Sequence, residues 1–219
     1  MGWTELQIGR TQRRRQSGPA PRPLAAFDFD GTLTVRDSFN ALLIWRAGPF
    51  GAAWRAVSLL PAALAYLVHR DRGRLKAALV RAFLRGVSAE ALSRDAERFC
   101  AARFDRLMRP DALERWEDWG RQGAERVIVT ASPELTVAPL AARLGADRLI
   151  GTRLAADAAG RLTGDLDGRN CRGPEKVARL EAVFGPQVRL AAAYGDTSGD
   201  REMLGIAEIP SYRGFTGRP

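Results

Sequence analysis

Three short apolar runs, each followed at once by polar residues, constrain the fold of this chain more than any other feature of its sequence. Runs of this length between turn-forming segments are typical of buried strands. They span residues 24–29, 126–130 and 190–194. Asp28, Thr130 and Asp196 lie at the ends of these runs or shortly after them. The sequence therefore predicts that these three polar side chains meet at one edge of a sheet.

Two amphipathic stretches separate the later runs, and proline and glycine mark their ends. The first opens at Ser132-Pro133 and closes at Gly145, and the second opens with Gly-Pro at residues 173–174 and closes at Gly185. Proline is favoured in the first helical turn and glycine just after the last one. Strands that alternate with helices predict an α/β fold with a doubly wound parallel-sheet core, whose ligand sites lie at the carboxyl ends of the strands.

The long segment between the first two runs has a different character. Residues 36–123 are rich in Ala, Leu, Arg and Trp at helical spacing and carry little strand signal, which predicts an inserted all-helical domain. The core then comprises residues 24–35 and 124–219. Within the core, glycines and acids around short apolar pieces at residues 154–168 predict a β-hairpin, or a strand with a tight turn, near the active edge.

Two further segments carry no motif, but they indicate a basic tail and a possible membrane contact. Residues 1–23 hold five arginines against one acid and end in the proline-rich stretch SGPAPRP, so we expect a disordered basic tail. In the insertion, residues 56–68 run for thirteen residues without a charge, too few for a spanning helix, which needs about 20 apolar residues. A packed helix is the first expectation there, and shallow membrane contact within residues 50–68 is the alternative.

Charge and cysteine usage limit the partners and the chemistry. The formal net charge is +9, yet no recognised nucleic-acid-binding module accompanies it, so we expect no nucleic-acid partner. Cys100 and Cys171 lie far apart, which indicates neither a disulfide framework nor a zinc site and fits a cytoplasmic protein. The single histidine, His69, cannot build a histidine-based site alone. Acid-base chemistry therefore falls to carboxylates.

The first apolar run leads into the segment DFDGTLT at residues 28–34, which places two carboxylates two residues apart. In a continuing strand, Asp28 and Asp30 would point to the same face. Two acids that face one cleft repel each other, and such an arrangement persists where a cation or substrate chemistry requires it. Gly31 allows the backbone to turn away and a phosphate to approach closely.

This segment resembles the opening motif, DxDGTLT, of the haloacid dehalogenase superfamily, in its phosphoserine-phosphatase-like branch. The resemblance implies a phosphatase that hydrolyses phosphomonoesters through an aspartyl-phosphate intermediate. It assigns Asp28 as the nucleophile and a Mg²⁺ ligand. Asp30 would protonate the leaving alcohol, activate the hydrolytic water and bind Mg²⁺ through its backbone carbonyl. The chemistry fits, because a phosphomonoester dianion repels a carboxylate unless a metal and hydrogen-bond donors neutralise both.

Two later segments resemble further motifs of this family. Residues 195–200 match GDxxxD, in which Asp196 ligates the metal and Asp200 binds it directly or through water. Related phosphatases often have Asn at the position of Gly199, so a contact made there is not carried over. The strand ending at Thr130 matches the second motif, with the Thr130 hydroxyl and the amides of Ala131 and Ser132 as expected ligands of phosphoryl oxygens. We interpret the Ser132 side chain first as a helix cap.

The third motif supplies a cation to balance the carboxylates. Residues 170–176, NCRGPEK, resemble the CxGxxK form of this branch, which assigns the role to Lys176. Some relatives place the lysine just before the glycine, where this chain has Arg172, so Arg172 remains the alternative cation and a candidate substrate contact. We expect Cys171 to be a small packed residue and not a nucleophile.

The resemblance also implies that residues 36–123 form a helical cap that closes over the site and selects the leaving group. Asp37 stands where phosphoserine phosphatases carry a glutamate that holds the substrate amine. The stretch SPELTVAPLA at residues 132–141 is similar to bacterial enzymes that dephosphorylate phosphatidylglycerophosphate. The expected substrate is thus a small phosphorylated metabolite or a phospholipid head group. The alternative of another class is a non-catalytic basic module that binds a membrane or a partner, and the complete set of carboxylates argues against it.

Overall fold

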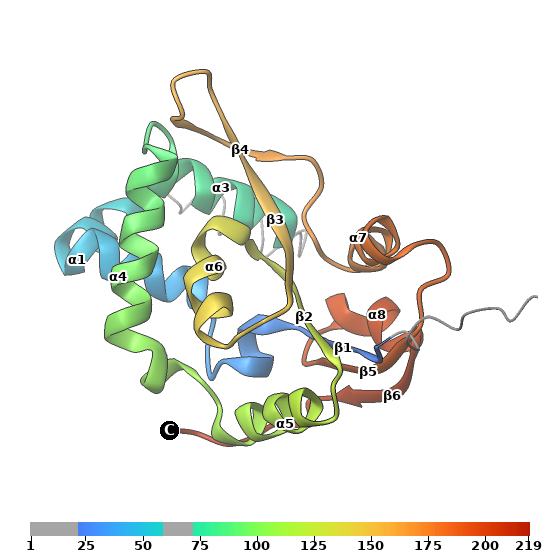
Figure 1. Ribbon diagram of the computed structural model, residues 1–219. Helices are drawn as coiled ribbons and strands as arrows, with labels where there is room; N and C mark the ends of the chain where they lie inside the picture. Colours follow the sequence, from blue (N-terminus) through green and yellow to red (C-terminus); the bar gives the residue numbers. More distant parts are fainter. Residues whose placement is uncertain (1–21, 59–71) are drawn as a thin grey trace, which may run out of the picture.

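The computed structural model describes residues 22–58 and 72–219 and is built around a six-stranded sheet with the order β4-β3-β2-β1-β5-β6 (Figure 1). β3 and β4 pair antiparallel, and every other neighbouring pair is parallel. The predicted α/β fold with a mainly parallel sheet is therefore confirmed. The strands are β1 (Leu24–Phe27), β2 (Glu125–Pro133), β3 (Arg148–Ala156), β4 (Leu162–Asp167), β5 (Leu190–Gly195) and β6 (Ala207–Tyr212).

The central strand β1 delivers the first motif to the edge of the sheet. Phe27 pairs with Ile128 of β2 on one side and with Tyr194 of β5 on the other. The next residue, Asp28, still donates its amide to the Tyr194 carbonyl at 2.8 Å. Because β1 lies between strands that follow it in the chain, its carboxyl end is a topological switch point, where open α/β sheets bind ligands.

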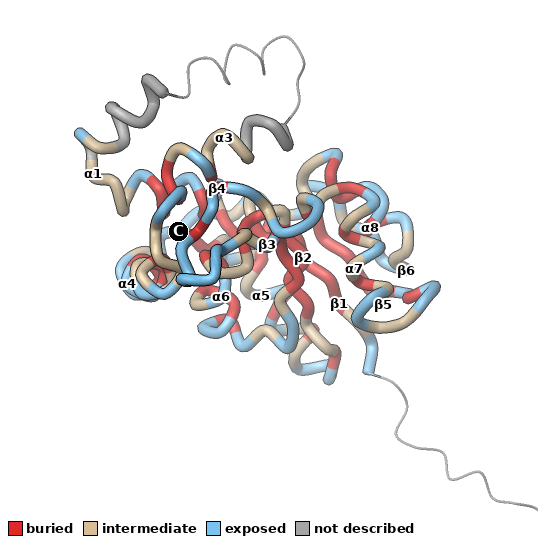
Figure 2. Tube along the Cα trace, turned by 90° about the horizontal axis from the view of Figure 1, so that it is seen from above, coloured by how far each residue is buried: buried red, intermediate tan, exposed pale blue. Residues whose placement is uncertain are grey.

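Alternate residues of the central strands face two separate apolar clusters. Phe27 and Ile128 point into a large cluster shared with the helices of the insertion, whereas Ala26 and Val127 point into a smaller one on the opposite face. Figure 2 shows the buried strands between helices on both sides. Four helices cover the two faces: α5 (Pro110–Arg121) and α6 (Glu134–Arg143) on one, α7 (Pro174–Phe184) and α8 (Arg201–Gly205) on the other. The core is thus doubly wound.

The described residues of the insertion between β1 and β2 form helices joined by short connections, in which Ser88 and Met108 each make an isolated β-bridge. Its helices are α1 (Ser38–Ser58), α3 (Arg72–Leu84), α4 (Ala89–Leu107) and α5. α1, α3 and α4 lie together beside the sheet (Figure 1). In contrast, α5 packs on the sheet itself, where the fully buried Trp116 ring meets the Phe27 ring with centroids 5.0 Å apart. The boundary of a separate cap domain within residues 36–123 stays a prediction.

The predicted hairpin at residues 154–168 is present. β3 and β4 form it around a turn at residues 157–161. It packs against α3, and a Cβ atom on Gly164 would lie 3.2 Å from the Arg81 backbone. None of its residues lines the cavity described below. The hairpin extends from the carboxyl edge of the sheet and reaches α3, whose Leu79 lines the cavity, but it supplies no lining residue of its own.

Parts of two sequence-based predictions fall outside the described residues: the tail through residue 21, and residues 59–69, which include His69 and most of the uncharged stretch. The last two tail residues are ordered. Arg22 donates to the Ala124 carbonyl at 2.8 Å, and the Pro23 carbonyl accepts the Glu125 amide at 2.8 Å. The predicted tail boundary is therefore wrong for these two residues. Among residues 22–58 and 72–219, each helix is either too short or too polar to span a bilayer.

Candidate active site

The chain turns sharply after β1, and this turn brings the first motif against the loop after β5. Residues Phe29–Leu33 form an irregular helical turn in which Gly31 has a φ of 88°. A Cβ atom on Gly31 would overlap the Asp196 carboxylate. Glycine is therefore required here for its positive φ and for this close approach. The Thr32 hydroxyl lies 3.4 Å from a carboxylate oxygen of Asp28 and from one of Asp196, and so links the two acids.

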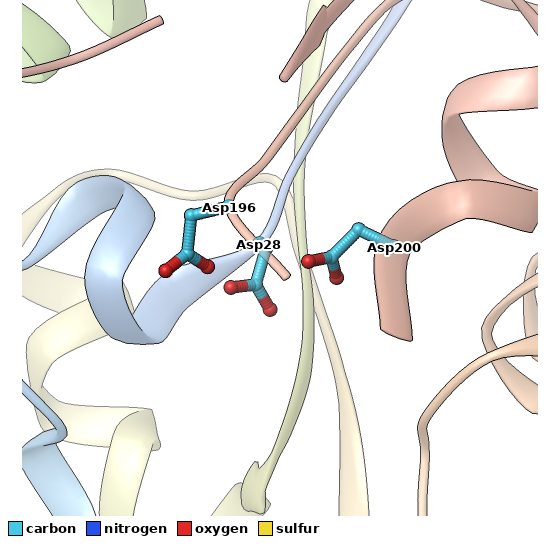
Figure 3. Close-up of side chains that lie close together, drawn as sticks. All are labelled: Asp28, Asp196 and Asp200. Carbon is cyan, nitrogen blue, oxygen red and sulfur yellow. The ribbon is translucent and has the colours of Figure 1, made fainter. Parts of the chain in front are cut away.

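Three carboxylates converge at this edge of the sheet, and Figure 3 shows how they approach one another. Ligand oxygens of Asp28, Asp196 and Asp200 all lie within 4.8 Å of one another. One Asp200 oxygen also accepts hydrogen bonds from the amide and the hydroxyl of Thr197, each at 2.9 Å, which fixes the carboxylate. Oxygen ligands supplied by two or three acids are what Mg²⁺ prefers. The set therefore fits a Mg²⁺ ion.

Lys176 of α7 is the cation that reaches these carboxylates. Its side chain is only 1% exposed, and its ammonium donates to Asp28 at 2.6 Å, to Asp200 at 2.7 Å and to the Val129 carbonyl at 2.5 Å. These three bonds use all three N–H donors of the ammonium group. The alternative cation, Arg172, donates instead to the hydroxyls of Thr197 and Ser198, at 3.3 and 3.1 Å. Of the two candidates, the structure brings only Lys176 into contact with the acids.

The electrostatics of the cluster leave an excess of negative charge. Burial raises the pKa of Asp28 to about 7, and repulsion from Asp200 adds to this rise, while Lys176 opposes it. Burial also raises the pKa of Asp196. For Lys176, burial acts to lower the pKa, but Asp28 and Asp200 outweigh it and the net shift is upward. One ammonium thus faces three acids, and a divalent cation would relieve the remaining repulsion.

Asp30 lies beside this cluster and is held from both sides. One oxygen accepts the backbone amide of Ser38 at 2.6 Å, and the other accepts the Ser132 hydroxyl at 2.5 Å. The prediction that Ser132 caps the following helix is wrong. Strand β2 continues through Pro133, so α6 begins one residue later, with Pro133 at the N-cap and no side-chain capping bond.

The second motif also lies at the site, but one of its predicted phosphate donors is already hydrogen-bonded. Thr130 is 1% exposed, and its hydroxyl oxygen accepts the Ser132 amide at 3.0 Å. The Ser132 amide, which the sequence predicted for phosphoryl oxygens, is therefore already engaged. Because the Thr130 oxygen accepts from Ser132, its own proton is free to be donated elsewhere. Cys171 is fully buried, and burial raises its pKa to about 11, which agrees with a packed residue and not a nucleophile.

Most of these groups, but not Asp196, line one cavity of about 270 Å³ between the sheet edge and the inserted helices. We use the term cavity floor for Asp28, Thr130, Lys176 and Asp200. On the other side, Asp37, Phe39, Asn40 and Leu79 form what we call the helical rim. The full lining comprises Asp28, Asp30, Asp37, Phe39, Asn40, Leu79, Thr130, Ala131, Ser132, Asn170, Arg172, Lys176, Thr197 and Asp200.

Sequence reasoning found the floor but missed most of the rim. Asp37 was predicted as a substrate contact, and it does line the cavity, but one of its oxygens also accepts the Asn40 amide at 2.7 Å and so caps α1. Phe39, Asn40 and Leu79 were not identified. Helical spacing shows that a segment is a helix, but it does not show which of its residues face a separate sheet. No short motif marks these three positions.

Comparisons with known proteins are consistent with this geometry. A model of haloacid dehalogenase-like hydrolases matches residues 25–205, which include every motif above. Protein CicA of Caulobacter vibrioides (strain NA1000 / CB15N) is 58% identical over 199 residues, which cover 90% of this chain and 88% of that protein.

Solved structures share the fold. A protein of unknown function from Bordetella pertussis Tohama I gives a TM-score of 0.70 at 23% identity and covers 84% of this chain and 86% of that one. A phospho-aspartyl intermediate analogue of phosphoserine phosphatase gives a TM-score of 0.55 at 22% identity, covering 85% of this chain and 83% of that one. At these identities, the likeness concerns the fold alone.

Proposed function

This chain belongs to the haloacid dehalogenase-like hydrolases, and from that membership we propose that it is a Mg²⁺-dependent phosphatase that uses Asp28 as its nucleophile. One observation carries the proposal. The Asp28 carboxylate stands at the end of the central strand, in contact with Lys176 and within 4.8 Å of two further acids. A structural role does not require three acids to meet beside one cavity, because their mutual repulsion is costly.

In the proposed first step, an Asp28 oxygen attacks the phosphorus atom of a phosphomonoester. The new O–P bond forms as the bond between phosphorus and the leaving oxygen breaks, and Asp30 gives that oxygen a proton. In the second step, Asp30 removes a proton from water, the water oxygen bonds to phosphorus, and the Asp28 carboxylate is released with inorganic phosphate. Asp28, Asp196 and Asp200 would hold the Mg²⁺ ion, which supplies positive charge against the phosphate.

The remaining residues of the floor position the reacting groups. Lys176 orients Asp28 through the 2.6 Å contact and balances part of the negative charge. The Thr130 hydroxyl keeps a proton to donate to a phosphoryl oxygen, since its own oxygen already accepts the Ser132 amide. We further propose that Ala131 and Arg172, which also line the cavity, contact the substrate.

The proposed substrates are phosphomonoesters with a compact group next to the phosphate. The cavity of about 270 Å³ is bounded by the helical rim, in which Phe39 and Leu79 are apolar and Asn40 is polar. Its size suits a small phosphorylated metabolite or the head group of a phospholipid. Both belong to the same chemistry, and a screen of phosphorylated metabolites and lipids would distinguish them.

The decisive experiment measures phosphate release from an aryl phosphate by the purified protein, with Mg²⁺ and with a chelator. We expect turnover only with Mg²⁺. Acid-quenched mass spectrometry should find a phosphoryl group on Asp28 in Asp30→Asn, because an aryl leaving group needs little protonation. The Asp28→Asn protein should show neither adduct nor turnover, since an amide cannot form the intermediate. Turnover by Asp28→Asn would overturn the mechanism, and an inactive wild-type protein would favour a non-catalytic module.

A further inference from the structure

The geometry points to Ser132 as a positioning residue that holds Asp30 for proton transfer to the leaving group. This inference rests on the proposed function, since it assigns a role within the same reaction. Ser132 is 3% exposed and stands at the end of β2, beside the turn that carries Asp30. Its hydroxyl donates to an Asp30 oxygen at 2.5 Å, and hydrogen bonds to a charged group are the stronger ones.

The two partners of Asp30 differ in what they can do. The Ser38 amide can only donate, so the oxygen it contacts remains an acceptor. A hydroxyl both donates and accepts, so the oxygen that faces Ser132 can carry or lose a proton without losing its partner. This is what a group needs if it is first an acid and then a base. Ser132 therefore fixes the orientation of Asp30 and can hydrogen-bond to its carboxyl group whether that group is protonated or ionised.

Ser132 also ties the acid to the phosphate end of the cavity. Its backbone amide donates to the Thr130 hydroxyl oxygen at 3.0 Å, while its side chain holds Asp30. One residue thus sets the spacing between the proposed phosphate donor and the proposed proton donor. Replacing the side chain leaves the amide in place, so Ser132→Ala removes only the contact to Asp30. The two functions can therefore be separated by experiment.

The test compares Ser132→Ala with wild-type protein on two substrates, an alkyl phosphate and an aryl phosphate with an acidic phenol. The alkyl leaving group needs the proton from Asp30, and general acid catalysis typically contributes about 10² to 10⁴-fold. Losing part of it should lower kcat/KM, which reports only the first step, by about 10-fold or more for the alkyl substrate and by less than about 3-fold for the aryl substrate. In contrast, kcat for the aryl substrate should fall as well, because Asp30 is also the base of the second step. Inhibition by inorganic phosphate should be unchanged, because the contact to Thr130 is kept.

Thr136→Val is the matched control. Thr136 is also 3% exposed, and its hydroxyl donates to the Pro133 carbonyl at 2.8 Å. Its loss should affect both substrates equally. Ser132→Thr restores the hydroxyl and should recover the alkyl rate. Should Ser132→Ala fold poorly, Ser132→Cys keeps the shape with a weaker donor and should show the same ordering of substrates.

Equal losses of kcat/KM on both substrates, or an unchanged kcat/KM for the alkyl substrate in Ser132→Ala, would overturn the role of Ser132 while leaving the phosphatase assignment intact. A wild-type protein without Mg²⁺-dependent turnover would instead overturn the proposed function itself. The two failures are therefore distinguishable in one set of assays.

Discussion

The cavity floor and the helical rim face each other across the same small space, but they are held together by different forces. On the floor, Asp28, Lys176 and Asp200 are almost completely buried and bonded to one another. On the rim, Asp37 and Asn40 are exposed. Removing one partner of a buried charge pair leaves the other uncompensated, whereas an exposed polar group is solvated by water. The floor should therefore tolerate almost no change, and the rim should tolerate much more.

Replacing Lys176 should break the floor most severely. Lys176→Met leaves two buried acids without their common cation, which should lower kcat/KM by about 10² to 10³-fold and cost about 3–5 kcal/mol of stability. Arg172→Met should lower kcat/KM by less than about 10-fold, because within the described part of the chain Arg172 donates to the hydroxyls of Thr197 and Ser198 and forms no ion pair with the acids. Steady-state kinetics and thermal unfolding of both variants make the comparison. If Arg172→Met were the more damaging, the assignment of the cation would be reversed.

The second prediction separates the two later acids. Asp196 is half-buried and shares a hydrogen bond with Thr32, whereas Asp200 is bonded to Lys176 and Thr197. Asp196→Asn should raise the Mg²⁺ concentration needed for half-maximal activity by about 10-fold or more, and excess Mg²⁺ should restore much of kcat. Asp200→Asn also removes a partner of Lys176, so excess Mg²⁺ should not restore kcat in that variant. A Mg²⁺ titration of kcat for each variant checks this, and equal rescue of both would contradict the distinction.

The sequence predicted the floor better than the rim for a physical reason. Apolar runs mark buried strands, so Asp28 and Thr130 of the floor, and the neighbouring Asp196, could be placed near one edge from the pattern, and the resemblance supplied Lys176 and Asp200. The rim depends on how α1 and α3 sit over the sheet, which is decided by packing between distant segments. Ser132 was misinterpreted because a serine before a helix usually caps it. Here the strand runs through Pro133, three residues past the apolar run, and the hydroxyl meets Asp30 instead.

The third prediction uses the raised pKa of Asp28, a property of the metal-free floor. The pKa is about 7 in the folded protein and near 3.8 in the unfolded chain, so the folded state binds a proton that the unfolded state releases. Asp28 therefore contributes stability that is full below about pH 4 and is lost as pH rises through about 7. Since Mg²⁺ must displace this proton, the increase in Tm caused by Mg²⁺ should be larger at pH 8 than at pH 5.

Calorimetry with Mg²⁺ and with a chelator, at both pH values, measures this difference. The Asp28→Asn protein lacks the titrating group and serves as the control. In that variant, the Mg²⁺-dependent increase in Tm should lose most of its dependence on pH. A larger stabilisation at pH 5 than at pH 8 in the wild-type protein would show that the Asp28 carboxylate does not bind the ion.

On the rim, substitutions of Asp37 should change preference more than rate. Asp37→Ala removes both a charge and the cap of α1, whereas Asp37→Asn removes the charge but can still accept the Asn40 amide. If the charge selects the leaving group, both variants should alter the ranking of phosphorylated metabolites and leave kcat on a small aryl phosphate within about 3-fold. Only Asp37→Ala should lose stability, by about 1 kcal/mol. Equal losses on every substrate would show that the rim does not select the substrate.

The smallest effects should come from the start of the chain, at the opposite end of β1 from Asp28. A protein that lacks residues 1–21 should keep its kcat/KM and its Tm, because the composition of that segment cannot bury enough apolar surface to stabilise a fold.

Removing residues 22 and 23 as well deletes the hydrogen bonds of Arg22 to Gly123 and Ala124 and of the Pro23 carbonyl to Glu125. These tie the beginning of β1 to β2, and each contributes about 0.5 kcal/mol, because Arg22 is exposed. The longer deletion should therefore lower Tm by a few degrees without changing kcat/KM. Unfolding curves and kinetics of the two truncations measure this, and a loss of activity with the shorter deletion would show that the tail belongs to the site.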